Sequence, residues 1–276
     1  MIKVIRGTIS EKMNTYITRE KNPEMMDSEF GVISLNKGEL YTIFTKEEYV
    51  FCLNQGHVIF RWDDNEEKAE RKNCFSDDPT VLHVHQGTKV ELEALSDKVE
   101  INVANTNNEK IFENRLIRPD ELMCHETVES EKLDGKVKRI KRVFFNRSIC
   151  PETNLFCGEV VNYPGCWACF PPHLHEEPEI YYYKFFPEQG YGFAEYGDEA
   201  IKVLNRSVTC NPGNQLHSQA TAPGYAGYIM WTQRLQNNGK DIEYRLDETH
   251  AWLDEEGVKI FPDGKETGEW NGTNCD

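Results

Sequence analysis

Short apolar, β-branched and aromatic runs, separated by Gly, Asn and Asp, make up most of this chain. In the first half they are ELYTIFT, EEYVFCL, HVIFRW, TVLHVH, KVELEAL and VEINVAN; after residue 141 they are VFFN, EIYYYKFF, YGFAEY, AIKVLN, SVTC and YAGYIMWTQRL. Runs of this kind between turn residues are typical of β-strands. Helical periodicity is scarce, and residues 118–133 are the best candidate for a short helix. The pattern predicts an all-β sandwich or barrel with few helices.

The two halves of the chain resemble each other weakly. The segment from Glu47 to Phe60 can be laid on EIYYYKFFPEQGYGF so that Glu48 matches Glu179. In that register Thr42 and Phe44 stand where the second half has two histidines. We therefore expect a duplicated barrel whose first copy lacks metal ligands.

The boundaries follow from this duplication. We expect a first barrel without metal in residues 1–125, a metal-binding barrel in residues 126–256 and a polar tail in residues 257–276. The charged, glycine-containing stretch from Pro119 to Lys141 is the expected junction.

Composition narrows the class of partner. The 276-residue chain is globular in composition, with 38% hydrophobic residues, and carries a formal charge of −16. Nucleic acids and anionic membranes attract basic surfaces, so neither is an expected partner. The N-terminus lacks the apolar core of a signal peptide, no run reaches membrane-spanning length, and the nine cysteines are odd in number. We expect a cytoplasmic protein with free thiols. The sequence leaves the oligomeric state, including a homo-oligomer, open.

The candidate chemistry lies in the stretch FPPHLHEEPEIYYYKFF. His173, His175, Glu179, Tyr181 and Tyr183 are all odd-numbered, so a continuing strand would point them to one face. Two imidazoles and a carboxylate suit one divalent ion such as Zn, Mn, Fe or Ni. A later histidine that follows a Pro-Gly turn, at position 217, supplies a fourth candidate ligand. The plainer alternative is a polar strand edge.

Several motifs around these residues resemble one family. The stretch GCWACFPPHLHEEPEIYYYK resembles G-x-W-S-S-Y-P-P-H-K-H and the following E-x-Y-Y of the uronate isomerases that include 5-deoxy-glucuronate isomerase. PEQGYGF, HSQATAPGYAGY, DETHAWL and RPDELMCHE resemble further motifs of that family. The likeness runs from about residue 116 to residue 252, and the first half aligns only loosely.

This resemblance implies a bicupin, with two tandem double-stranded β-helix (jelly-roll) barrels. Carried over by position, the metal ligands in the second barrel are His173, His175, Glu179 and His217. The implied activity is that of an intramolecular oxidoreductase, an aldose–ketose isomerase of inositol catabolism. Its implied substrate is a small anionic sugar acid.

One departure keeps other functions open. The interval between Glu179 and His217 is shorter than in 5-deoxy-glucuronate isomerase, and PGNQLHS is closer to 5-keto-4-deoxyuronate isomerase of pectin breakdown. A sugar-binding cupin without catalysis, or an iron-dependent cupin dioxygenase, would use the same ligand set.

Further roles are expected for five residues. Isomerisation through an enediol needs a proton donor or acceptor near the metal, and Tyr181 and Tyr183 face the right way. Gln189, Arg234 and Lys184 are candidates for binding the substrate, although Lys184 has the opposite strand parity. The second His-x-His pair, at positions 83 and 85, is expected to be structural.

Overall fold

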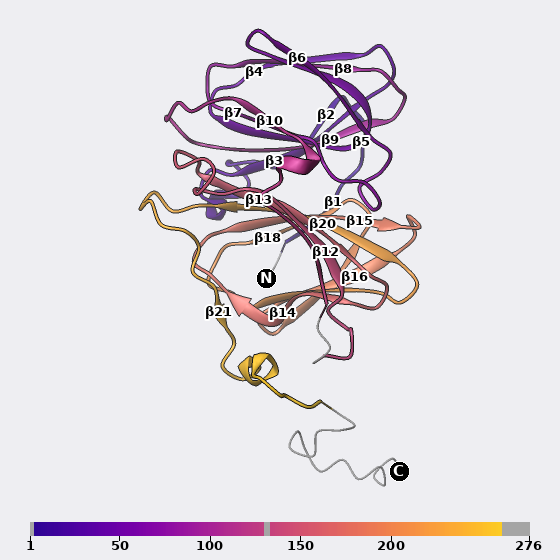
Figure 1. Ribbon diagram of the computed structural model, residues 1–276, viewed down its shortest axis with the longest axis vertical. Helices are drawn as coiled ribbons and strands as arrows, with labels where there is room; N and C mark the ends of the chain where they lie inside the picture. Colours follow the sequence, from indigo (N-terminus) through magenta and orange to yellow (C-terminus); the bar gives the residue numbers. More distant parts are fainter. Residues whose placement is uncertain (1–2, 130–132, 261–276) are drawn as a thin grey trace.

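The computed structural model describes residues 3–129 and 133–260 and consists of two stacked β-barrels (Figure 1). The strands of the first barrel are β2 (Met13–Ile17), β3 (Glu29–Leu35), β4 (Leu40–Phe44), β5 (Glu48–Trp62), β6 (Asn65–Arg71), β7 (Val81–Val84), β8 (Lys89–Ala94), β9 (Val99–Thr106) and β10 (Arg115–Ile117). Those of the second are β1 (Val4–Arg6), β11 (Cys124–Val128), β12 (Arg139–Phe145), β13 (Leu155–Asn162), β14 (Trp167–Leu174), β15 (Glu179–Phe186), β16 (Tyr191–Tyr196), β17 (Glu199–Leu204), β18 (Ser207–Asn211), β19 (His217–Thr221), β20 (Ala226–Arg234) and β21 (Arg245–Leu246).

Helices are few and short in the described residues. Those that lie wholly within these residues are the 3-10 turns η1 (Pro23–Met25), η2 (Pro119–Glu121) and η4 (Ala251–Asp254). No helix in the described ranges has the length and apolarity needed to cross a membrane.

The two barrels repeat one pattern of antiparallel pairing. In the first, β5 pairs with β7 and β9, β3 with β9, and β4 with β8. In the second, β15 pairs with β18 and β20, β13 with β20, and β14 with β19. The predicted all-β fold of two related barrels is therefore confirmed.

Strand alternation sorts side chains between the barrels and their interface. On β15, Ile180 and Tyr182 belong to a large apolar cluster that spans both barrels, whereas Tyr181 and Tyr183 face the interior of the second barrel. On β5, Val50 packs in the interface cluster, and its neighbours in sequence lie inside the first barrel. The main core of the molecule is thus the layer between the two barrels.

Buried charges also join the barrels across this interface. Arg71 from β6 lies 2.5 Å from a carboxylate oxygen of Glu159 on β13, and Arg142 lies 2.8 Å from the same carboxylate. Removing one member of a buried, hydrogen-bonded pair leaves an uncompensated charge and is strongly destabilising. The Arg71–Glu159 pair therefore ties the first barrel to the second, and Arg142 adds a second cation to the same carboxylate from within the second barrel.

Three expectations about the backbone need correction. Residues 118–129 do not form the expected helix, because η2 is followed by strand β11, which extends the sheet of the second barrel; residues 130–132 of that stretch lie outside the described residues. Residues 4–6 do not belong to the first barrel, because β1 pairs with β18. The register of the duplication is displaced, since Thr42 and Phe44 are exposed and the inward side chains of β4 are Tyr41 and Ile43. Most of the expected tail, residues 261–276, lies outside the described residues.

Candidate active site

Four side chains, three from strands β14, β15 and β19 and one from the residue that follows β14, converge inside the second barrel. His173 on β14 pairs in register with His217 at the start of β19, and their ring centroids are 4.5 Å apart. Glu179 begins β15, and one of its carboxylate oxygens lies 3.1 Å from His175 Nε2 and 3.5 Å from His217 Nε2. The structure therefore brings together all four residues expected to bind a metal.

A tight turn positions His217. Gly213, in the Pro-Gly turn before β19, has φ +92°, and a Cβ there would lie 2.2 Å from the carbonyl oxygen of Glu176. Only glycine fits this backbone conformation and this close approach. The next amide, of Asn214, donates to the carbonyl oxygen of His175 at 2.6 Å. The turn thus ties the segment that carries His175 to the one that carries His217.

The hydrogen bonds of His217 leave one ring nitrogen for a ligand role. Its Nδ1 lies 3.0 Å from the carbonyl oxygen of Gln215, to which a protonated Nδ1 donates, and 3.1 Å from the side-chain nitrogen of Asn211. Its Nε2 is buried, faces Glu179 and has no hydrogen-bond partner among the described residues. An orphaned, lone-pair-bearing nitrogen beside a carboxylate is suited to a divalent cation.

The other donors fit the same ion. Ligand atoms of His175, Glu179 and His217 all lie within 4.8 Å of one another, and those of Cys169, His173 and His217 form an overlapping group. The two groups share His217, so a single ion between them would be reached by three imidazoles and a carboxylate. The donor set therefore fits one divalent metal.

Burial and mutual charge set the protonation of these residues. Burial, together with the neighbouring His217, lowers the pKa of His173 to about 3. Burial also lowers the pKa of His217. Burial opposes charge on His175 and Glu179 as well, but their hydrogen bond and opposite charges outweigh it, raising the pKa of His175 and lowering that of Glu179. Two imidazoles are thus neutral and the carboxylate is ionised, as metal binding requires, whereas His175 holds its proton against Glu179 and would release it to a bound metal.

The cluster lies at the wall of a cavity of about 440 Å³ in the second barrel. Arg139 of β12 lines it and donates to the carbonyl oxygen of Val137 at 2.9 Å, and it makes no ion pair with a described carboxylate. Burial lowers the pKa of Arg139, and interactions with Cys169 and Glu126 offset this only in part. An incompletely compensated guanidinium beside a cavity is suited to binding a carboxylate.

The two candidate proton-handling tyrosines occupy different positions. Tyr181 lines the cavity, and its hydroxyl donates to Glu179 at 2.6 Å. Burial raises its pKa well above the ordinary value, so it remains a neutral phenol and acts as a donor. Tyr183 is not among the cavity-lining residues and donates instead to Gln219 at 2.7 Å. The structure therefore favours Tyr181 over Tyr183 for direct contact with a substrate.

The three expected substrate-binding residues lie away from this cavity, which corrects that expectation. Gln189 is exposed in the turn before β16. Lys184 has the outward parity of β15 and is buried at the interface, 2.7 Å from Glu100. Arg234 follows Gln233 on β20 and therefore faces the opposite side of the sheet.

Sequence reasoning missed several residues that the structure places at the site. Gln233 Nε2 lies 3.0 Å from His175 Nε2, and its amide oxygen accepts from the Tyr244 hydroxyl at 3.1 Å. The ring of Tyr244 also lies against His173, with centroids 5.3 Å apart. Strand alternation places Arg139 and Gln233 each on one of two faces, but alone it does not say which face meets the cavity. No local pattern marks Tyr244, which lies outside the strands.

Fold and site together define a bicupin with a candidate His₃Glu metal centre in its second barrel. The chain belongs to the KduI/IolB family, whose model matches residues 4–253. It is 25% identical over 243 residues to the 5-deoxy-glucuronate isomerase of Geobacillus thermodenitrificans (strain NG80-2), covering 81% of this chain and 85% of that protein.

Solved structures share the fold. The IolB-like protein from Salmonella typhimurium LT2 superposes with a TM-score of 0.82 and 22% identity, over 91% of this chain and 99% of that one. Oxalate decarboxylase from Lactobacillus farciminis superposes with a TM-score of 0.61 and 10% identity, over 87% and 85% of the two chains. The resemblance recognised in the motifs is thus confirmed at the level of family and fold.

Proposed function

We propose that this protein is a metal-dependent aldose–ketose isomerase whose substrate is 5-deoxy-glucuronate. The observation that carries the proposal is the convergence of His173, His175, Glu179 and His217 at a cavity that also holds Arg139. The relatives named 5-deoxy-glucuronate isomerase support the substrate. The proposal includes a role in inositol catabolism in the cytoplasm.

The four clustered residues hold the ion. A divalent ion bound there would act as a Lewis acid on the carbonyl oxygen of the substrate. Zn, Mn, Fe and Ni all accept imidazole and carboxylate ligands, so the donor set admits any of them. Gln233 and Tyr244 border His175 Nε2 and would lie beside the bound ion.

The remaining residues bind the sugar acid and move protons. The guanidinium of Arg139 pairs with the substrate carboxylate, which explains how an anion binds to a protein of charge −16. Tyr181 is a neutral phenol in the free protein, and its hydroxyl acts as the proton donor to an oxygen of the substrate near Glu179. Cys169 is an unsuitable base, because burial raises the pKa of its thiol to about 12.

The sister reaction is the second candidate. PGNQLHS, which contains the turn that positions His217, is closer to the corresponding stretch of 5-keto-4-deoxyuronate isomerase. That substrate also carries a carboxylate, so Arg139 would serve it equally.

The test offers both uronates to the metal-loaded protein and follows them by proton NMR. Conversion of 5-deoxy-glucuronate, lost on chelation and restored by added metal, is the expected result. Conversion of 5-keto-4-deoxyuronate alone would assign the protein to the sister reaction. Conversion of neither would overturn the isomerase, and oxygen uptake in the same samples would identify a dioxygenase.

A further inference from the structure

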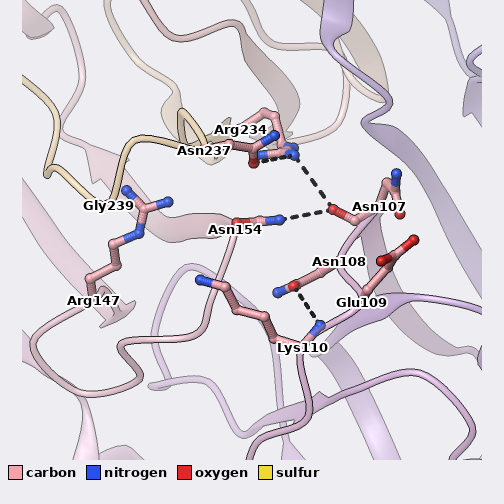
Figure 2. A pocket seen from close by; sticks show the side chains of 9 residues that line it. All are labelled: Asn107, Asn108, Glu109, Lys110, Arg147, Asn154, Arg234, Asn237 and Gly239. Carbon is pink, nitrogen blue, oxygen red and sulfur yellow. Dashed lines mark hydrogen bonds between the residues drawn. The ribbon is translucent and has the colours of Figure 1, made fainter.

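A second, cationic cavity of about 310 Å³ lies where the two barrels meet (Figure 2). Its walls come from both of them: Asn107 and Lys110 follow β9 of the first barrel, whereas Arg147, Asn154 and Arg234 belong to the second. It lies on the far side of β20 from the candidate metal centre, because Gln233 faces that centre and Arg234 the junction.

The two arginines of this cavity have no carboxylate partner among the described residues. Arg234 donates to the side-chain oxygen of Asn237 at 3.1 Å and to carbonyl oxygens of residues 107 and 235. Arg147 likewise donates only to carbonyl oxygens, of Thr153, Gln236 and Lys240. Figure 2 shows the bonds that tie Arg234 to Asn107 and Asn237.

This differs from the other buried arginines. Arg71 and Arg142 are as deeply buried, and each is paired with Glu159. Arg234 is 4% exposed and Arg147 8% exposed, so water compensates little of their charge. In addition, Arg234 Nε is buried without a hydrogen-bond partner in the part of the chain that the structure describes. Buried guanidinium groups are normally neutralised by an anion, and no described carboxylate pairs with Arg147 or Arg234.

Neighbouring acidic groups do not supply it. Glu109 lines the cavity but is exposed and makes no ion pair with either arginine. Glu48 lies behind the wall, where it accepts hydrogen bonds from Asn108 and the Asn154 amide and pairs with His83 at 2.7 Å. The lining therefore keeps an excess of positive charge.

We propose that this junction cavity is a second binding site, for a small molecule that carries a phosphate or carboxylate group. Arg147 and Arg234 bind the oxyanion, Lys110 adds a third cation at the rim, and the amide groups of Asn107 and Asn154 contribute hydrogen-bonding capacity. The volume is at the lower end of the range of small-ligand pockets, about 300–1,000 Å³. Because the walls come from both barrels, the bound anion cross-links them.

The first experiment measures binding of inorganic phosphate and, separately, of D-glucuronate by calorimetry and by thermal shift at constant ionic strength. Binding that raises the melting temperature is expected, because a ligand that binds only the folded state stabilises it. Phosphate binding alone identifies phosphate as the preferred group, and glucuronate binding that persists in Arg139→Gln identifies the carboxylate; glucuronate binding that Arg139→Gln abolishes belongs to the candidate active site and, without phosphate binding, would overturn the proposal. Absence of both would overturn the proposal.

Variants locate the site. Arg147→Gln and Arg234→Gln should each weaken binding by about tenfold or more, as expected for loss of one charged hydrogen-bonding partner. Arg118→Gln, which removes an exposed arginine paired with Glu67, is the matched control and should leave binding unchanged. Equal affinity in all three variants would contradict the assignment.

A variant that adds a carboxylate to the cavity tests the proposed anion site even if the arginine variants fold poorly. In Asn237→Asp the new carboxylate stands where the amide oxygen already accepts from Arg234, so it should raise the melting temperature without ligand and weaken anion binding. Asn238→Asp makes the same charge change at the next residue, outside the cavity lining, and should do much less. Identical behaviour of the two variants would refute the site, and turnover of the uronate in each reports the metal centre separately.

Discussion

The two barrels share their strand pairing but differ in the side chains that point inward. In the first, Tyr41 and Ile43 of β4 pack against an apolar interior. In the second, the equivalent strand β14 brings His173 opposite His217, and Glu179 stands at the head of β15. In the described ranges, every group of three or more side chains placed to hold a metal lies in the second barrel. The two barrels therefore share a fold because their strands pair in the same way, whereas a few inward side chains decide which barrel can hold a metal.

The histidines of the first barrel illustrate the difference. His83 also lies near a glutamate, with Nε2 2.7 Å from Glu48. Its ring is stacked between Phe145 and Phe112, at centroid distances of 4.1 and 4.5 Å, and Glu48 accepts further hydrogen bonds from Thr153 and Asn108. His83 Nε2 already has Glu48 as its partner, whereas His217 Nε2 has no hydrogen-bond partner among the described residues. A His–Glu contact is thus structural in one barrel and a candidate ligand pair in the other.

The largest effect is expected from His217→Ala. Removing the imidazole with the free Nε2 should empty the metal site and reduce turnover of the uronate to the uncatalysed background, measured by proton NMR. His85→Ala, in the first barrel, serves as control and should retain full turnover. Equal losses in the two variants would abolish the distinction between the barrels.

The next effect separates the two tyrosines of the second barrel. Tyr181→Phe should lower kcat by about tenfold to a thousandfold if its hydroxyl donates a proton in the reaction. Tyr183→Phe should change kcat much less, because its hydroxyl bonds to Gln219 and does not line the cavity. A larger loss in Tyr183→Phe would show that the proton passes by another route.

Arg139→Gln tests how the second barrel binds an anion. Loss of one charged hydrogen-bonding partner should reduce kcat/KM by about tenfold to a hundredfold, mainly through KM, with the metal content unchanged. Arg115→Gln, which removes an exposed arginine of the first barrel, is the control. An unchanged KM would remove Arg139 from the substrate site.

His83→Ala should have the smallest effect on activity, but it should clearly lower stability. Breaking the buried pair with Glu48 should lower the free energy of unfolding by about 3 kcal/mol, measured by urea denaturation. Metal content should not change. A loss of metal without a loss of stability would mean that His83 binds an ion.

Local pattern predicted much of this architecture. The alternation of apolar and polar residues gave most strands of both barrels, and odd parity placed His173, His175 and Glu179 on one face. The same rule sends Lys184 to the face opposite Tyr181 and Tyr183, and it separates Arg234 from Gln233, but alternation alone does not say which face of β12 or β20 meets the cavity. Strand alternation says nothing about residues in loops. Gln189 lies in a turn, and Tyr244 reaches the histidines only because the chain folds back after β20.

The displaced register in the first barrel has a physical cause. The segment from Thr42 to Glu48 contains a turn, and a shift of one residue in a strand moves every side chain to the other face. Matching Glu48 with Glu179 therefore placed the exposed Thr42 and Phe44 at ligand positions. The conclusion that the first barrel lacks this ligand set survives, because Tyr41 and Ile43 point inward instead.

Metal content per chain tests the asymmetry of the barrels most directly. Elemental analysis of the purified protein should find one divalent ion per chain, none in the His175→Ala/His217→Ala double variant, and still one in the His83→Ala/His85→Ala double variant. Two ions per chain, a loss of metal in the first-barrel variant, or full occupancy in the second-barrel variant would contradict the account.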